Sequence, residues 1–511
     1  MTRPTMTKTL TVLAAALLAS GCANLAPPYE RPALPVPATL PSPVPLAVVP
    51  TATPTAAQAA ASGPAATPAD INADTTAGPR LPAEQAAAAA WRSFFTEPRL
   101  RGTVELALAN NRDLRVAALN IERARAQYRI QEAAVLPAIN ATGSGNRQRQ
   151  PASVSSNGQA RITSTYSAQL GISAYELDFF GRVRNLSDAA LQTFLSTQSN
   201  RRTTQIALVA DTATAWLNLA ADQQRLLLAQ QTLKARQDSY ELTRRAFELG
   251  GQSGLTLAQA QTTVDSARVD VAAYTTQVQQ SRNALELLAG SPVPAELLPD
   301  AQAPSVIERP VAALVEVPAA LPSAVLQQRP DVVAAEELLK GAQASIGAAR
   351  AAFFPRITLT AAAGVASGEL SSLFSGGNGA WSFVPSITLP IFNAGSNQAN
   401  LDVAMAQRDI QLATYEKTLQ VAFREVADAL AQRSTLAERL AAQQSLTEAT
   451  GRTLQLSQAL FRSGAYSYLE VLDAQRTLYT AQQTLITLRL AEQANRLTLY
   501  RVLGGGWADA S

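Results

Sequence analysis

Residues 461–475 read FRSGAYSYLEVLDAQ, and residues 247–261, 214 positions earlier, read FELGGQSGLTLAQAQ. The two stretches share Phe, Gly, Ser, Leu, Ala and Gln at aligned positions, and the same register later places Gly290 on Gly504. Further upstream the offset becomes 218 residues, which aligns Asp113 with Asp331 and Pro137 with Pro355. The aligned Gly, Pro and Phe residues indicate a tandem duplication, roughly 91–300 and 301–507, followed by a short tail, 508–511.

Each half predicts the same order of helices and strands. The first half begins with a helix over 103–135, which ends before Pro137 because proline does not continue a helix. Thr, Ser, Ile and Tyr with partial alternation then predict strands at 138–146 and 164–178, matched in the second half by 356–366 and 380–391. Long helices are expected at 187–249 and 398–463, and return helices at 254–289 and 467–503. A helix over 187–249 would reach about 95 Å, about three times a bilayer core, so it must project away from a membrane.

Both return helices carry an apolar seam with spacings of three and four residues. A period of 3.5 residues predicts knobs-into-holes packing against neighbouring helices. The seam consists of Leu257, Ala260, Val264, Ala267, Val271, Tyr274 and Val278 in the first half and Val471, Ala474, Leu478, Ala481, Leu485 and Leu488 in the second. A periplasmic coiled-coil scaffold without a pore is the alternative interpretation. It explains the heptads but not the four symmetrically placed strands.

The N-terminus predicts an export signal. Arg3 and Lys8 precede an apolar run that is too short to span a membrane, which is typical of a signal peptide over 1–21. The ending LASGC at residues 18–22 resembles a bacterial lipobox, in which Cys22 is lipidated; an ordinary signal peptide with a chance Cys is the alternative. Ala23 at the second mature position favours sorting to the outer membrane by the same resemblance. Residues 22–89 then form a lipidated Pro/Ala-rich tether.

Composition argues against an enzyme. The chain has no His and a single Cys, which removes the usual general base, zinc sites and an intrachain disulfide. Removing Arg3 and Lys8 with the signal lowers the formal net charge from +3 to +1, which gives no reason to expect a nucleic-acid partner. After the signal, no segment has 18 uninterrupted apolar residues, so strands would have to span the membrane. Four strands cannot close a barrel, and several chains must therefore contribute.

The sequence resembles the outer-membrane factor family of tripartite efflux pumps, the TolC-like channels, and within it the OprM-like lipoprotein branch. The resemblance extends from Trp91 to Trp507. Its most specific stretches are Arg329-Pro330-Asp331, IGAARAAFFP at 346–355, LDFFGR at 177–182, LDAQR at 472–476 and LGGGW at 503–507.

This resemblance implies a mainly α protein with a β-barrel portion. Three copies would form a 12-stranded outer-membrane β-barrel joined to a 12-helix periplasmic α-barrel. It implies an exit duct for an RND-type multidrug pump, lipid-anchored in the outer membrane with a long periplasmic extension. The expected partners are a homotrimer, a periplasmic adaptor, the inner-membrane pump and outer-membrane lipid. No catalytic residue, metal or cofactor is expected beyond the covalent lipid on Cys22. The alternative function is the exit duct of a type I protein secretion system.

The candidate gate lies on one face of the second return helix. Leu469, Asp473 and Arg476 follow i, i+4 and i+7, and their shared face lies roughly 140° from the seam. By resemblance they form a hydrophobic constriction, an acidic ring and an arginine that ties adjacent helices. Ordinary solvated charges are the alternative for Asp473 and Arg476. The first half has Leu255, Gln259 and Thr262 at the equivalent places, and Glu470, nearer the seam, is a weaker candidate.

Small residues at the two helix turns are candidates for adaptor docking. Gly250 and Ser253 in the first half, with Gly464 and Ser467 in the second, would let another helical hairpin approach closely. The alternative is that these residues only form the turns.

Overall fold

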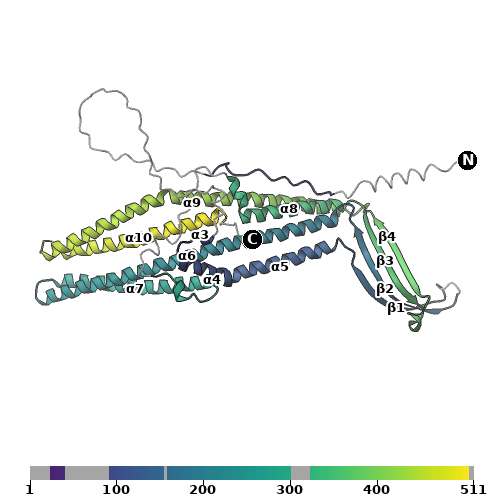
Figure 1. Cartoon of the computed structure of the whole chain (residues 1–511), viewed down its shortest axis with the longest axis horizontal. Helices are drawn as coiled ribbons and strands as arrows, with labels where there is room; N and C mark the ends of the chain where they lie inside the picture. Colours follow the sequence, from purple (N-terminus) through teal and green to yellow (C-terminus); the bar gives the residue numbers. More distant parts are fainter. Residues whose placement is uncertain (1–23, 41–90, 155–157, 301–322, 466, 506–511) are drawn as a thin grey trace, which may run out of the picture. The chain divides into compact units, whose positions relative to one another are not determined.

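The computed structural model describes residues 24–40, 91–154, 158–300, 323–465 and 467–505 (Figure 1). The chain divides into two compact units. Unit 1 comprises Met1–Ala33, Ala117–Arg201 and Pro330–Thr418, and unit 2 comprises Leu34–Val116, Arg202–Arg329 and Leu419–Ser511. Each compact unit therefore contains segments of both predicted repeats, so the two compact units do not coincide with the two sequence repeats.

Unit 1 contains one antiparallel sheet of four strands. In spatial order these are β1 (Ile139–Gln150), β2 (Arg161–Leu177), β3 (Arg356–Ser367) and β4 (Gly379–Thr388). All four predicted strands are confirmed, although the first hairpin is longer than expected and β4 ends earlier. The central pairing of β2 with β3 joins the two repeats. A bulge between Ile172 and Tyr175 interrupts it, where Ala174 has a φ of 51°.

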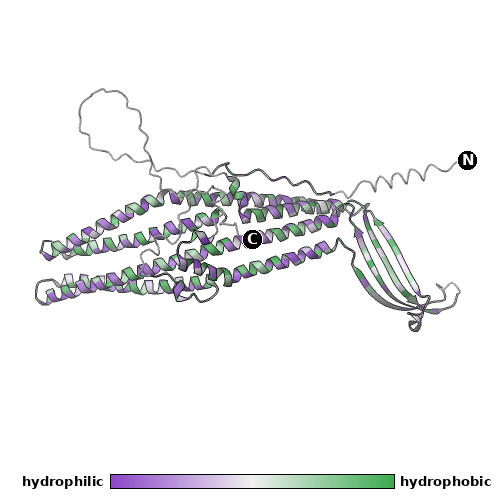
Figure 2. Ribbon diagram, viewed as in Figure 1, coloured by the Kyte–Doolittle hydropathy of each residue, from purple (hydrophilic) through white to green (hydrophobic). Residues whose placement is uncertain are grey.

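The alternation of side chains gives this sheet one apolar and one mostly polar face. Because paired residues share a face, the register places Leu170, Ala363 and Trp381 together on the apolar one. Hydrophobic residues recur along the strands in Figure 2. The apolar face carries Ile139, Ala141, Ala168, Ile172, Ile357, Leu359, Ala361, Val365, Phe383 and Ile387 as well. The opposite face carries Asn140, Thr142, Ser144, Asn146, Thr163, Thr165, Gln169, Thr358, Thr360, Ser382 and Ser386.

Two long helices, α6 (Arg182–Glu248) and α9 (Ser396–Arg462), contribute to both units. Each has 67 residues and reaches about 100 Å. In unit 1, α8 (Pro330–Ala351) packs closely on α6. A Cβ at Gly341 would lie 3.4 Å from the carbonyl oxygen of Ala189, so glycine permits this approach. Among the helices that the structure describes, none combines the length and the apolar character needed to cross a membrane.

Unit 2 contains α3 (Trp91–Phe94), α4 (Pro98–Asn110) and the return helices α7 (Gly254–Ala289) and α10 (Tyr468–Val502). Its core is built around Trp216, Phe95, Leu217, Leu285 and Leu497, all nearly inaccessible to solvent. The seam residues of α7 and α10 are buried or half-buried, as their spacing predicts. Both return helices begin and end within one residue of the expected bounds.

The first predicted helix, 103–135, is wrong as a single element. The structure has α4 and α5 (Arg112–Ala133), separated by Asn111 with φ −60° and ψ 133°. The Asn111 side chain accepts from the Leu114 amide and donates to the Leu288 carbonyl at the end of α7, both at 2.9 Å. Asn111 thus lies at the end of α4, caps the start of α5 and holds the end of α7 through its side chain.

Candidate functional site

The three predicted gate residues lie together on α10, and all point away from its seam. Leu469 is 59% exposed, and the side chains of Asp473 and Arg476 are 60% and 77% exposed. Their seam neighbours Val471 and Ala474 are buried. The periodicity of the sequence therefore placed these residues correctly on an accessible face.

These residues line a groove between α7 and α10 of about 440 Å³, which we call the gate groove. Its other wall includes Gln259 and Thr262, the first-repeat counterparts of Asp473 and Arg476. Equivalent positions of the two repeats therefore face the same space. At these two equivalent positions the first repeat has neutral side chains, and the charged first-repeat residues of the groove are the half-buried Asp270 and the buried Arg236. The well-exposed charges of the groove are therefore those of Asp473 and Arg476 on α10.

Arg476 forms an ion pair with Asp473 three residues earlier on the same helix. The resemblance implied instead that this arginine ties adjacent helices. In one copy of the chain, and within its described residues, the pair stays on α10. Since both side chains are well exposed, it contributes little to stability and can exchange partners at low free-energy cost.

The gate groove also contains a buried cation, Arg236, that the sequence did not predict. Arg236 of α6 is only 8% exposed, donates to the Thr263 carbonyl at 2.9 Å, and lies 5.6 Å from the ring centre of Tyr479. Burial is the largest cause that raises the pKa of the Tyr479 hydroxyl, and the negative charge of Asp270 is the second. The sequence does show an arginine within α6, but its burial could not be predicted because it depends on the packing of α6 with α7 and α10.

Glu470, the weaker gate candidate, is exposed and is not among the residues that line the gate groove. The structure thus separates it from Leu469, Asp473 and Arg476.

The four docking candidates lie at the ends of the helical hairpins and are exposed. Gly250 and Gly464 both have a φ of 76°, and space within 4 Å of a Cβ at either position is empty. Ser253 also acts as a cap, since its Oγ accepts from the Thr256 amide at 3.2 Å. Ser467 is the N-cap residue of α10 but makes no capping side-chain hydrogen bond.

A second groove, of about 530 Å³, lies beside these turns, and we call it the tip groove. Residues of α6, α9 and α10 line it, with Leu242, Phe461, Tyr468 and Val471 giving it an apolar wall. The sequence predicted the turns but not this groove, because the residues that line the groove come from helices far apart in the chain.

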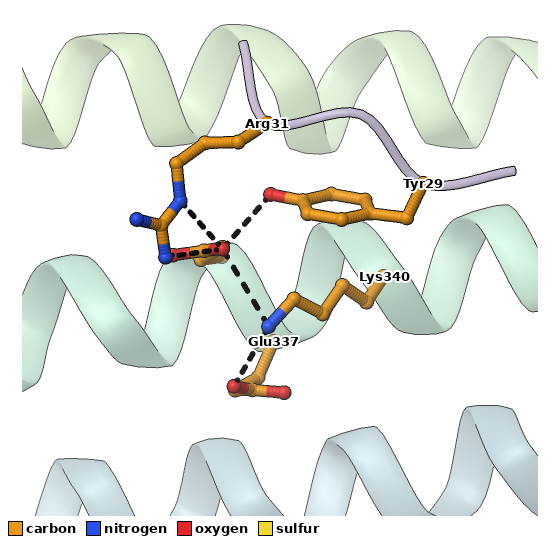
Figure 3. A network of polar contacts seen from close by, with 5 residues as sticks. Tyr29, Arg31, Glu337 and Lys340 are labelled. Atoms are coloured by element: carbon orange, nitrogen blue, oxygen red, sulfur yellow. Dashed lines mark hydrogen bonds and ion pairs between the residues drawn. The ribbon is translucent and has the colours of Figure 1, made fainter.

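An N-terminal strap, defined here as residues 24–33, packs on α8 within unit 1. Arg31 donates to both carboxylate oxygens of Glu336, at 2.9 and 2.8 Å, and the Tyr29 hydroxyl donates to the same group at 3.0 Å. Lys340 completes this network at 3.5 Å (Figure 3). Glu336 is only 2% exposed, so the strap supplies most of the partners of a buried charge.

Further contacts hold the strap along α8. The Gln343 amide donates to the carbonyls of Pro27 and Pro28, and a Cβ at Gly347 would come within 2.7 Å of the Ala26 nitrogen. The composition of 22–89 predicted a tether but gave no indication of this docking. Cys22, the predicted lipidation site, lies outside the described residues, as does most of the tether. The described residues contain no cluster of three or more side chains suited to a metal ion.

A sheet with one apolar face and two long helical hairpins define the class of protein: a membrane-channel subunit. The profile of the outer membrane efflux protein family matches residues 103–291 and again residues 321–505, once in each predicted repeat. The chain belongs to this family. It is an outer-membrane protein and serves as the exit duct of a tripartite efflux pump.

Relatives share nearly the whole chain. The probable efflux pump outer membrane protein TtgC of Pseudomonas putida is 48% identical over 505 residues, covering 99% of this chain and 97% of that protein. The cation efflux system protein CusC of Escherichia coli is 40% identical over 492 residues, and the match covers 96% of this chain and 97% of that protein. The open state of the MtrE outer membrane channel of Neisseria gonorrhoeae matches with a TM-score of 0.78 at 36% identity, covering 95% of this chain and 98% of that one.

Proposed function

We propose that three copies of this chain close a 12-stranded barrel that spans the outer membrane, and that its polar face lines the pore. The observation that carries the proposal is the sheet itself. It has one apolar and one polar face, and its edge strands β1 and β4 have no further partner among the described strands. A lipid environment leaves no sheet edge unpaired, so β1 of one copy would pair with β4 of the next.

The gate groove supports a closing function at the helical end of the pore. Three copies of Asp473 around one axis would form an acidic ring that attracts cations and is screened by salt. Three copies of Leu469 would add a hydrophobic constriction. In the trimer Arg476 would exchange its partner on α10 for one on an adjacent helix.

We propose further partners on the same basis of structure and relatives. The tip groove and the small residues Gly250, Ser253, Gly464 and Ser467 offer a surface on which helices of a periplasmic adaptor dock. An RND-type pump in the inner membrane would then deliver hydrophobic organic compounds to the duct, giving resistance to several drugs. Relatives are named as toluene and antibiotic efflux proteins, which supports that substrate class. A lipid on Cys22 would anchor the mature N-terminus ahead of the strap.

Planar-bilayer recording of the purified, lipidated chain tests the duct. We expect trimers that resist dissociation in detergent and conduct ions, and a deletion strain that regains solvent and antibiotic tolerance when the gene is restored. Chains that remain monomeric and give silent bilayers would contradict the proposal. Restored protein secretion without restored tolerance would favour the alternative, a type I secretion duct.

A further inference from the structure

The far end of the first β-hairpin carries a concentration of positive charge. From Ile139 to Leu170 the sequence contains three arginines, Arg147, Arg149 and Arg161, and neither Asp nor Glu. All three arginines are exposed. Arg161 donates to the side chain of Gln150 at 3.0 Å. This end of the hairpin lies opposite the ends at which the strands of unit 1 continue into helices.

The register separates these arginines by face. Arg149 pairs with Ile162, and Arg147 pairs with Ser164, two residues from Tyr166 along the same face of β2. Arg147 and Arg149 therefore extend the apolar face of the sheet. Arg161 pairs with Gln150 and belongs to the polar face. Two charges on the face that meets lipid require an explanation, because an arginine in the hydrocarbon costs about 2–4 kcal/mol at the bilayer midplane.

Their height on the sheet resolves this conflict. Strand β1 is displaced by five residues relative to β3. Its first residue, Ile139, aligns through β2 with Ala361, which is five residues after the start of β3. The last residue of β3, Ser367, aligns with Gly145, which is five residues before the end of β1. Such a stagger is typical of the tilted strands of a barrel. With a tilt of about 40°, Arg147 and Arg149 would lie about 20–25 Å above Ile139, at the boundary of an apolar band about 25 Å tall. At that height an arginine meets headgroups, not hydrocarbon.

We propose that Arg147 and Arg149 form a binding site for the phosphate groups of an anionic lipid in the outer leaflet of the outer membrane. Two guanidinium groups two residues apart on one strand match a phosphorylated headgroup, which accepts paired hydrogen bonds from arginine. Tyr166 lies on the same face at the level of Gly145, where an aromatic ring is expected at a membrane interface. This site rests on the proposed barrel, in which β4 of the next copy, without any carboxylate, pairs with β1.

Binding of bis-phosphorylated lipid A to the purified full chain, measured by native mass spectrometry, tests this site. We expect R147Q/R149Q to weaken binding about 25-fold, because each arginine near a charged headgroup contributes about fivefold in affinity and the two contributions multiply. The matched control is R161Q, which removes an equal type of charge from the same hairpin end but from the polar face, and it should bind as the unaltered chain does.

Several outcomes would overturn the site. These are unchanged binding by R147Q/R149Q, an equal loss in R161Q, equal affinity for dephosphorylated lipid A, or displacement by inorganic phosphate at concentrations comparable to lipid. Conductance recorded from the same samples separates this proposal from the duct. Conducting channels without lipid selectivity would reject the lipid site alone, whereas silent unaltered chains would reject the barrel on which it rests.

Discussion

Glu336 places a carboxylate inside unit 1, and the strap provides its main counter-charge. Replacing Arg31 with Ala leaves Tyr29 and Lys340 as the partners of that buried charge among the residues that the structure describes. We expect a loss of about 2 kcal/mol in the free energy of docking, less than for a fully buried pair because the Arg31 side chain is 51% exposed. Limited proteolysis should release the strap sooner. The control is Arg92→Ala, which breaks the exposed pair with Glu105 and should change little.

The strap should also detach at high pH through Tyr29. Burial is the largest cause that raises the pKa of the Tyr29 hydroxyl above its ordinary value, and the hydrogen bond to Glu336 is the second. The docked state therefore disfavours the phenolate, so its stabilisation is complete below about pH 10 and is lost as the pH rises towards the raised pKa. Proteolysis of the strap at increasing pH should show this loss, and Tyr29→Phe should reduce it. An identical pH profile in both proteins would exclude Tyr29 as the titrating group.

Asp473 and Arg476 offer the sharpest residue-level test of the gate. Asp473→Ala or Arg476→Ala should raise the resting conductance several-fold in planar bilayers, because in the proposed gate each removes a charge that would hold the closed arrangement. Asp265→Ala is a matched control, since Asp265 forms an ion pair of the same spacing with Arg268 three residues later in α7, and both side chains are exposed. Equal conductance and equal antibiotic susceptibility in both gate variants would remove these two residues from the gate.

At the scale of single elements, Asn111 joins three helices. Its side chain caps α5 and holds the end of α7, and the residue is only 6% exposed. Asn111→Ala should destabilise unit 2 by about 1–2 kcal/mol, as expected for a lost cap. Asn110→Ala, which removes only a bond to the Leu106 carbonyl of its own helix, should cost less. A smaller effect at Asn111 than at Asn110, measured by thermal unfolding, would contradict this role.

Periodic features of the sequence predicted the corresponding helices and strands well. Features that depend on contacts between distant parts of the chain could not be predicted from the sequence. The 3.5-residue seam located α7 and α10, and Pro137 and Pro355 marked where helices give way to strands. The sequence predicted a continuous helix through Asn111, because the side chain's partner Leu288 lies 177 residues away. The exposure of the helix face that carries Leu469, Asp473 and Arg476 followed from helix geometry alone. The partners of Arg476 could not be predicted, since an exposed arginine can reach several carboxylates.

The strap illustrates the same limit more strongly. Its Pro-rich sequence has no periodicity, and the contact of Arg31 with Glu336 joins positions 305 residues apart. A buried glutamate in the middle of α8 was the available signal, but sequence alone does not show burial.

At the scale of the whole molecule, the proposed barrel requires that one face of the sheet meets lipid and the other meets water. Adjacent residues of β3 can separate these environments. Ala363 pairs with Trp381 and belongs to the apolar face, whereas Ala362 pairs with Ser382 and belongs to the polar face. Both lie near the middle of the strand, where arginine on the lipid side costs about 2–4 kcal/mol.

We therefore expect Ala363→Arg to reduce strongly the yield of trimer in the outer membrane, while Ala362→Arg assembles and changes conductance and ion selectivity instead. The two substitutions introduce the same side chain one residue apart, so differences in helix packing or secretion cannot explain a divergence between them. Heat-resistant trimers on gels and single-channel currents provide the measurements. If both variants assembled equally, or if Ala362→Arg were the one that failed, the two faces of the sheet would be assigned the wrong way round, and with them the lining of the pore.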